Sequence, residues 1–148
     1  MRTRRTAIAL LSLSMILLAS LAFAGATMAG GRPFTTQLLG ANERPGPGDP
    51  DGSGTASVTL NPGTGEVCYD YTVRDVAPLA AAHIHRATAD APGPIVIHLE
   101  PTSDFGGSGC LLAQRSLILE ILRNPSGFYI NVHNAAFPPG ALRGQLSR

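Results

Sequence analysis

The sequence predicts a mainly β fold, an antiparallel sandwich or barrel of about seven short strands with one short helix. Short runs in which every second residue is apolar recur along the chain, as expected for strands with one buried face. Clusters rich in glycine and proline, of which the chain holds 17 and 12, separate these runs. Only residues 111–123 carry apolar residues at a helical spacing.

The first half of the chain predicts three strands. Residues 34–39 form the first, and the Gly-, Pro- and Asp-rich segment 40–54 that follows is interpreted as a loop. Residues 56–60 and 67–73 each alternate apolar and polar side chains, and the Asn-Pro-Gly-Thr-Gly sequence at 61–65 separates them. This arrangement is typical of an antiparallel hairpin with one buried face.

The middle of the chain predicts two further strands. The sequence Ala-Ala-His-Ile-His-Arg at 81–86 is the first of them, and a Pro/Gly turn at 91–94 leads into the second at 95–99. The segment 105–109, Phe-Gly-Gly-Ser-Gly, is expected to be a flexible loop because it is so rich in glycine.

The last part of the chain predicts the helix and two strands. Residues 111–123 are expected to be helical, with Ser116 as a candidate N-cap and Asn-Pro at 124–125 as the end. Two strands follow at 128–134 and 141–146, joined by a turn that contains two prolines and a glycine.

The N-terminus predicts a secretory signal peptide over residues 1–26. A cationic start at 1–5 precedes an apolar run at 7–24, and small residues follow it. We expect the mature chain to begin near Gly25 or Thr27, and the protein to be secreted or extracytoplasmic. The alternative is a retained membrane anchor, since the run approaches the length of a spanning helix.

Composition narrows the classes of partner. Every one of the 11 basic residues is an arginine, and without the predicted leader eight arginines face ten acidic residues, a net charge of about −2. A protein of this charge has no basic surface for nucleic acid and little attraction to an anionic membrane. After the leader is removed, roughly 120 residues remain, which is enough for one domain.

The two cysteines, Cys68 and Cys110, both lie in the part predicted to be exported. An even number of cysteines in an oxidising compartment predicts one disulfide between them. Because the chain has no Cys-x-x-Cys sequence, we interpret this disulfide as structural.

The histidines suggest a metal site. In a strand, His83 and His85 point to the same side. In the 128–134 strand the apolar residues must face the core, so His133 points the other way, and His98 likewise opposes its apolar neighbours. If the strands are adjacent, His83, His85 and His133 could together bind copper or zinc, with His98 as a candidate fourth ligand. The alternative is an exposed strand face that needs no ligand.

The same alternation predicts that Arg143 points outward, toward an acid on a neighbouring strand.

No covalent catalyst can be assembled from the sequence, because it has no Gly-x-Ser-x-Gly elbow and Ser108 has no histidine near it in the chain. We therefore favour a non-enzymatic protein.

Three blocks carry a family resemblance: GDPDGSGTASVTL, AHIHRATADAPGPIVIHL and YINVHNAAFPPGALRGQL. Their order and spacing resemble the CHRD domain, a chordin-type domain frequent in exported bacterial proteins, and place that domain at residues 33–147. The resemblance implies an immunoglobulin-like or superoxide-dismutase-like antiparallel β-sandwich or barrel, through a distant likeness to copper,zinc superoxide dismutases. In those enzymes a His-x-His sequence supplies copper ligands, and the matching positions are His83 and His85. The other dismutase residues have no matching motif here.

Two functions remain open at this point. The first is a non-enzymatic extracytoplasmic binding or structural module with an unknown extracellular protein or glycan as partner. An exposed aromatic patch around Tyr129 and Phe137 would favour it. The second is a copper- or zinc-binding protein that uses the histidines.

Overall fold

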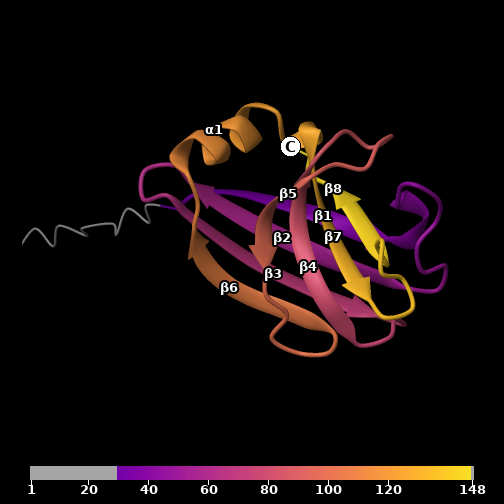
Figure 1. Cartoon of the computed structure of the whole chain (residues 1–148). Coiled ribbons are helices and arrows are strands. Elements are labelled where there is room, and N and C mark those ends of the chain that lie inside the picture. The colour runs from indigo at the N-terminus through magenta and orange to yellow at the C-terminus, as the bar shows by residue number, and fades with distance from the viewer. Residues whose placement is uncertain (1–29, 148) are drawn as a thin grey trace, which may run out of the picture.

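The computed structural model describes residues 30–147, which form eight strands, one α-helix and two 3-10 helices (Figure 1). In chain order the strands are β1 (Arg32–Leu39), β2 (Ser53–Asn61), β3 (Glu66–Arg74), β4 (Leu79–Arg86), β5 (Ile95–Leu99), β6 (Gly106–Leu112), β7 (Phe128–Asn134) and β8 (Leu142–Gln145). The helices are η1 (Gly40–Asn42), α1 (Arg115–Arg123) and η2 (Pro125–Gly127). The mainly β prediction is confirmed, whereas the predicted signal peptide over 1–26 lies outside the described residues.

All eight strands belong to one antiparallel sheet with the order β5-β4-β7-β8-β1-β2-β3-β6. The sheet curls until its two end strands, β5 and β6, lie beside each other, so it forms a nearly closed barrel (Figure 1). Strands β4 and β7 are neighbours in the sheet although they are far apart in the chain. His83 on β4 and His133 on β7 are 50 residues apart in the sequence.

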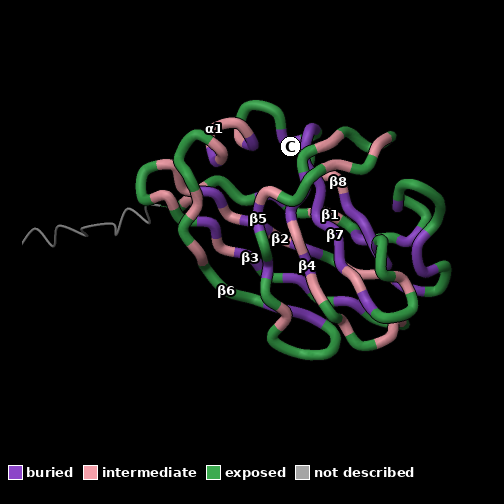
Figure 2. Tube along the Cα trace, in the orientation of Figure 1, coloured by how far each residue is buried: buried purple, intermediate pink, exposed green. Residues whose placement is uncertain are grey.

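The core lies inside the barrel and is built from one face of each strand. Ile84 on β4 and Phe128, Ile130 and Val132 on β7 are all buried, as the alternation predicted (Figure 2). Helix α1 contributes Ile118 and Ile121, spaced three residues apart so that both point to the same side of the helix. Burial of these apolar side chains is the main stabilising contribution to the fold.

The prediction of a flexible loop at 105–109 is wrong, because residues 106–109 belong to β6 and pair with β3. Gly107 lies opposite Tyr71, and Gly109 lies opposite Tyr69. A Cβ atom added to Gly107 would lie 2.6 Å from the Tyr71 hydroxyl oxygen, and one on Gly109 would lie 3.1 Å from that of Tyr69. The glycines therefore make room for the tyrosine rings of β3, and they are not a sign of a loop.

The predicted helix begins later than expected. Leu111 and Leu112 still pair with β3, and α1 begins at Arg115 with Gln114 at the N-cap position. Ser116 therefore lies inside the first turn and is not the cap. The predicted end is confirmed, since the helix stops at Arg123. Within residues 30–147, no helix is both long enough and apolar enough to cross a bilayer.

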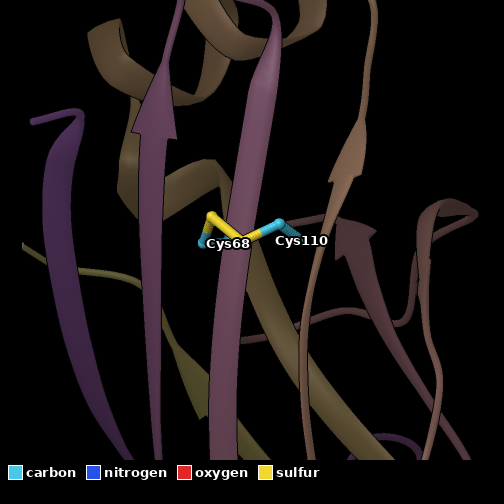
Figure 3. The surroundings of a disulfide bond; sticks show 2 residues. All are labelled: Cys68 and Cys110. Carbon is cyan, nitrogen blue, oxygen red and sulfur yellow. A yellow bond between two sulfur atoms is a disulfide. The ribbon is translucent and has the colours of Figure 1, made fainter. Parts of the chain in front are cut away.

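The predicted disulfide is present and links the two neighbouring strands β3 and β6 (Figure 3). Cys68 and Cys110 lie directly opposite each other, with their Cα atoms 4.0 Å apart. The bond therefore fixes β6, which is an end strand of the sheet, to the strand beside it.

A histidine cluster on the outer face of β4 and β7

Three of the four histidines come together on the side of the sheet opposite the core. His83 and His85 lie on β4, and His133 lies on the neighbouring β7 opposite Ala81. The ligand nitrogens of these three residues all lie within 4.8 Å of one another. His83 Nδ1 and His133 Nε2 are joined by a hydrogen bond of 3.1 Å.

This face is not the solvated surface that alternation alone suggests. His85 is 9% exposed, and Asn131 and Arg143 are 2% and 1% exposed. The 87–94 loop folds back over the strands, and Gly93 in that loop contacts both His85 and Tyr129. The alternative of an exposed strand face therefore does not hold for His85, Asn131 and Arg143, whereas His83 and His133 are half-buried.

Backbone carbonyl groups fix the orientation of two of the imidazole rings. His85 Nδ1 lies 2.8 Å from the carbonyl oxygen of Gly93, and His133 Nδ1 lies 2.9 Å from that of Pro138. A carbonyl oxygen can only accept, so each Nδ1 carries the proton and, in the neutral ring, leaves Nε2 as an acceptor. The Nε2 atom of His133 accepts a hydrogen bond from His83 Nδ1. The Nε2 atom of His85 is buried and has no hydrogen-bond partner among the described residues.

The three imidazoles are held in the neutral form. Burial, together with the neighbouring His133, His85 and His98, lowers the pKa of His83 to about 4. Burial also lowers the pKa of His85 and of His133, although the hydrogen bonds to Gly93 and Pro138 act in the opposite direction. At neutral pH the cluster therefore offers uncharged nitrogens, the form that binds metal ions.

Tyr129 and Arg143 support His85 from the side of β7 and β8. The Tyr129 ring stacks on the His85 ring with centroids 4.8 Å apart, and the Arg143 guanidinium carbon lies 3.4 Å from the centroid of Tyr129. Arg143 also donates hydrogen bonds to the carbonyl oxygens of Thr88 and Ala91 in the covering loop. It therefore does not face an acid on a neighbouring strand, as alternation had suggested, but holds the loop over the histidines.

Gly93 connects the 87–94 loop to the rings of His85 and Tyr129. Its N–H donates to the Tyr129 hydroxyl oxygen at 3.2 Å, while its carbonyl accepts from His85. A Cβ atom at this position would lie 2.1 Å from the carbonyl oxygen of Arg86, so the close approach requires glycine.

His98 lies next to the cluster but outside the group of ligand nitrogens. It is exposed on β5, directly opposite His83, and the two rings meet edge to face with centroids 4.9 Å apart. The structure thus brings together three of the four predicted metal ligands, and it places the candidate fourth, His98, beside them in an exposed position. Tyr129 is buried, so the exposed patch considered for Tyr129 and Phe137 is absent.

A buried polar pair, Asn131 and Glu43, lies beside the cluster and was not predicted from the sequence. Asn131 Nδ2 donates to Glu43 Oε1 at 2.6 Å, and both residues are buried. Burial raises the pKa of Glu43 to about 7, against the opposing effects of the hydrogen bond from Asn131 and the charge of Arg143. Glu43 lies in a Gly/Pro-rich loop, and no local pattern in the sequence indicates that its carboxyl group is buried.

Replacing Glu43 by glutamine is expected to stabilise the protein at pH 8 but not at pH 4.5. The folded state holds this proton more tightly than the unfolded chain does, so its contribution to stability is complete below about pH 4.5 and is lost as the pH rises through about 7. The difference between the two proteins should therefore grow with pH, up to about 3 kcal/mol. Glutamine keeps an oxygen that accepts from Asn131.

Urea unfolding of both proteins between pH 4.5 and 8 measures this difference. Glu66→Gln, at an exposed position, is the matched control and should show no such trend. A constant difference between Glu43→Gln and the natural protein across this range would contradict the prediction.

Fold and cluster together define a class, an antiparallel β-barrel-like domain with one disulfide and a group of histidines beneath its loops. The family model of the CHRD domain matches residues 34–146. The chain therefore belongs to the CHRD domain family, as its three sequence blocks suggested. Comparisons with curated proteins and with solved structures gave no significant match.

Proposed function

We propose that this CHRD domain is an extracytoplasmic protein that binds one copper or zinc ion through His83, His85 and His133. The observation that carries the proposal is the buried, unpartnered Nε2 of His85. His85 also belongs to a group of three histidines that each bring one ligand nitrogen within 4.8 Å of the others. A buried nitrogen with a free lone pair is costly unless something binds it. A metal ion would satisfy it, and would replace the hydrogen bond that joins His83 to His133.

The kind of metal follows from the donors. Neutral imidazole nitrogens suit copper and zinc, whereas calcium and magnesium prefer oxygen ligands. Two nitrogens bound to one ion at about 2.0 to 2.1 Å with tetrahedral angles lie about 3.3 Å apart, and the His83–His133 separation of 3.1 Å is close to this value. The carbonyl groups of Gly93 and Pro138 would act as the outer hydrogen-bond partners that orient histidine ligands.

Export is part of the proposal. The disulfide between Cys68 and Cys110 suits an oxidising compartment, and the cationic, apolar N-terminal sequence is that of a secretory leader. Mass spectrometry of the protein recovered from the cell exterior or periplasm tests this part. A chain that begins near Gly25 or Thr27 is expected, and a full-length chain in the cytoplasm would contradict it.

The non-enzymatic binding module for an extracellular protein or glycan is the second candidate. It is supported by a hollow of about 600 Å³ between β5, β6 and α1, which is lined in part by Val96, Leu111 and Leu117. Leu112 at its edge is 80% exposed. An apolar side chain this exposed is compatible with contact to a partner.

Calorimetric titration with Cu²⁺ and Zn²⁺ tests metal binding. The purified, metal-stripped protein is expected to bind one ion with submicromolar affinity, and the double variant His83→Ala, His85→Ala is expected to bind none. His98→Ala is the matched control, since it removes a neighbouring histidine outside the ligand group and should keep the affinity. Equal and weak binding by all three proteins would contradict the proposal and favour the second candidate.

A further inference from the structure

We propose that His98 is the uptake ligand of the cluster, the side chain through which a metal ion reaches and leaves His83, His85 and His133. This inference rests on the proposed metal site. In this role His98 determines how fast the ion binds, whereas the resident ligands His83, His85 and His133 set the affinity.

Other segments of the chain lie over His85, beside His133 and beside Asn131. Over His85, the 87–94 loop is held by Gly93 and by the hydrogen bonds that Arg143 donates to the loop. Beside His133, the loop that joins β7 to β8 is held by the contact with the Pro138 carbonyl group. Between β7 and the 40–52 loop, the buried pair of Asn131 and Glu43 fills the space.

His98 lies on the β5 side of the cluster, opposite His83. It lies on β5, an end strand of the sheet, and its side chain is exposed. It also lines the hollow between β5, β6 and α1, so solvent reaches it from that side. Figure 1 shows β5 in front of the barrel, with β4 on one side and β6 on the other.

A continuous series of imidazole rings leads from this exposed position inward. The ring of His83 lies 4.9 Å from that of His98 and 4.9 Å from that of His133, and 5.5 Å from that of His85. His83 is therefore the residue whose ring lies beside the exposed His98 and also beside both inner histidines. A hydrated ion that binds His98 is already beside the first resident ligand.

The chemistry is ligand exchange without any redox change. The nitrogen of His98 replaces one water of the hydrated ion, and the nitrogen of His83 then replaces a second. His98 is released once His133 and His85 complete the site, and the ion leaves by the reverse order. Because the same histidine assists both directions, its loss should slow association and dissociation alike and leave their ratio nearly unchanged.

Stopped-flow mixing with Cu²⁺ tests the inference. The protein has three tyrosines and no tryptophan. Tyr129 stacks on His85, so its fluorescence should be quenched when Cu²⁺ arrives. Dissociation is followed by mixing the loaded protein with excess EDTA. The variant is His98→Asn, and Leu112→Asn is the matched control, at an exposed position that lines the same hollow.

His98→Asn is expected to slow both association and dissociation by about tenfold or more, with an equilibrium affinity within about threefold of the natural protein. Leu112→Asn should leave both rates unchanged. Unchanged rates in His98→Asn would overturn the inference while leaving the proposed function intact. An affinity loss with unchanged association would make His98 a resident fourth ligand and would also overturn it. If the natural protein binds no Cu²⁺, the proposed function fails and the inference fails with it.

Discussion

Replacing Arg143 by methionine is expected to lower the free energy of unfolding by about 3 kcal/mol or more. The guanidinium group is 1% exposed and donates to the carbonyl oxygens of Thr88 and Ala91. Hydrogen bonds from a charged donor contribute about 1.5 to 3 kcal/mol each, and methionine leaves both carbonyl groups without their donor. The contact with the Tyr129 ring is lost as well.

The same substitution is expected to weaken binding of Cu²⁺ about tenfold, as changes outside the ligands of a metal site commonly do. Arg143 is not one of the proposed ligands, but it holds the loop whose Gly93 carbonyl group orients His85. A released loop would let the imidazole rotate and change the nitrogen that it presents.

Urea unfolding and calorimetric titration measure the two effects of Arg143→Met. Arg74→Met is the control, because the Arg74 side chain is 80% exposed and a change there should alter stability by no more than about 0.5 kcal/mol. Gly93→Ala should reproduce the loss of affinity without removing a charge. Normal affinity in both Arg143→Met and Gly93→Ala would show that the loop does not position His85.

Removing the disulfide with the double substitution Cys68→Ser, Cys110→Ser is expected to cost about 4 kcal/mol of stability. The two cysteines are 42 residues apart in the sequence, and a cross-link of this span restricts the unfolded chain over β4, β5 and most of β3 and β6. The effect acts mainly through the unfolded state, so the folded barrel need not change.

Urea unfolding of the double variant, beside the natural protein with its disulfide intact, gives this value. Metal affinity under folding conditions should be unchanged, because neither cysteine contacts the cluster formed by His83, His85 and His133. A loss of stability below about 1 kcal/mol would mean that the unfolded chain remains compact without the cross-link.

Local alternation of side chains was sufficient to predict most of the fold. Seven of the eight strands follow from it, and so do the core positions of Ile84 and Ile130. It failed at β6, because the glycines at 107 and 109 complement tyrosines on a strand more than thirty residues earlier in the chain. No pattern within 105–112 carries that information.

The sequence predicts the side of the strands on which the histidines lie, but it does not predict which residues surround them. A His-x-His strand requires His83 and His85 to share a side, and this follows from the sequence alone. The nearness of His133 depends on β4 and β7 being neighbours, which is a property of the sheet order. The burial of His85 depends on backbone contacts made by Gly93 and on the side chain of Arg143, and neither has a local signal.

The contact between His83 and His133 joins residues 50 apart in the chain, whereas that between His85 and Gly93 joins residues only 8 apart. An ion held by the cluster would therefore cross-link β4 to β7, and only the correctly paired sheet could bind it. By thermodynamic linkage, free metal at a hundred times its dissociation constant would add about 2.7 kcal/mol to the stability of the native pairing. The melting temperature of the protein would then report the metal concentration around it.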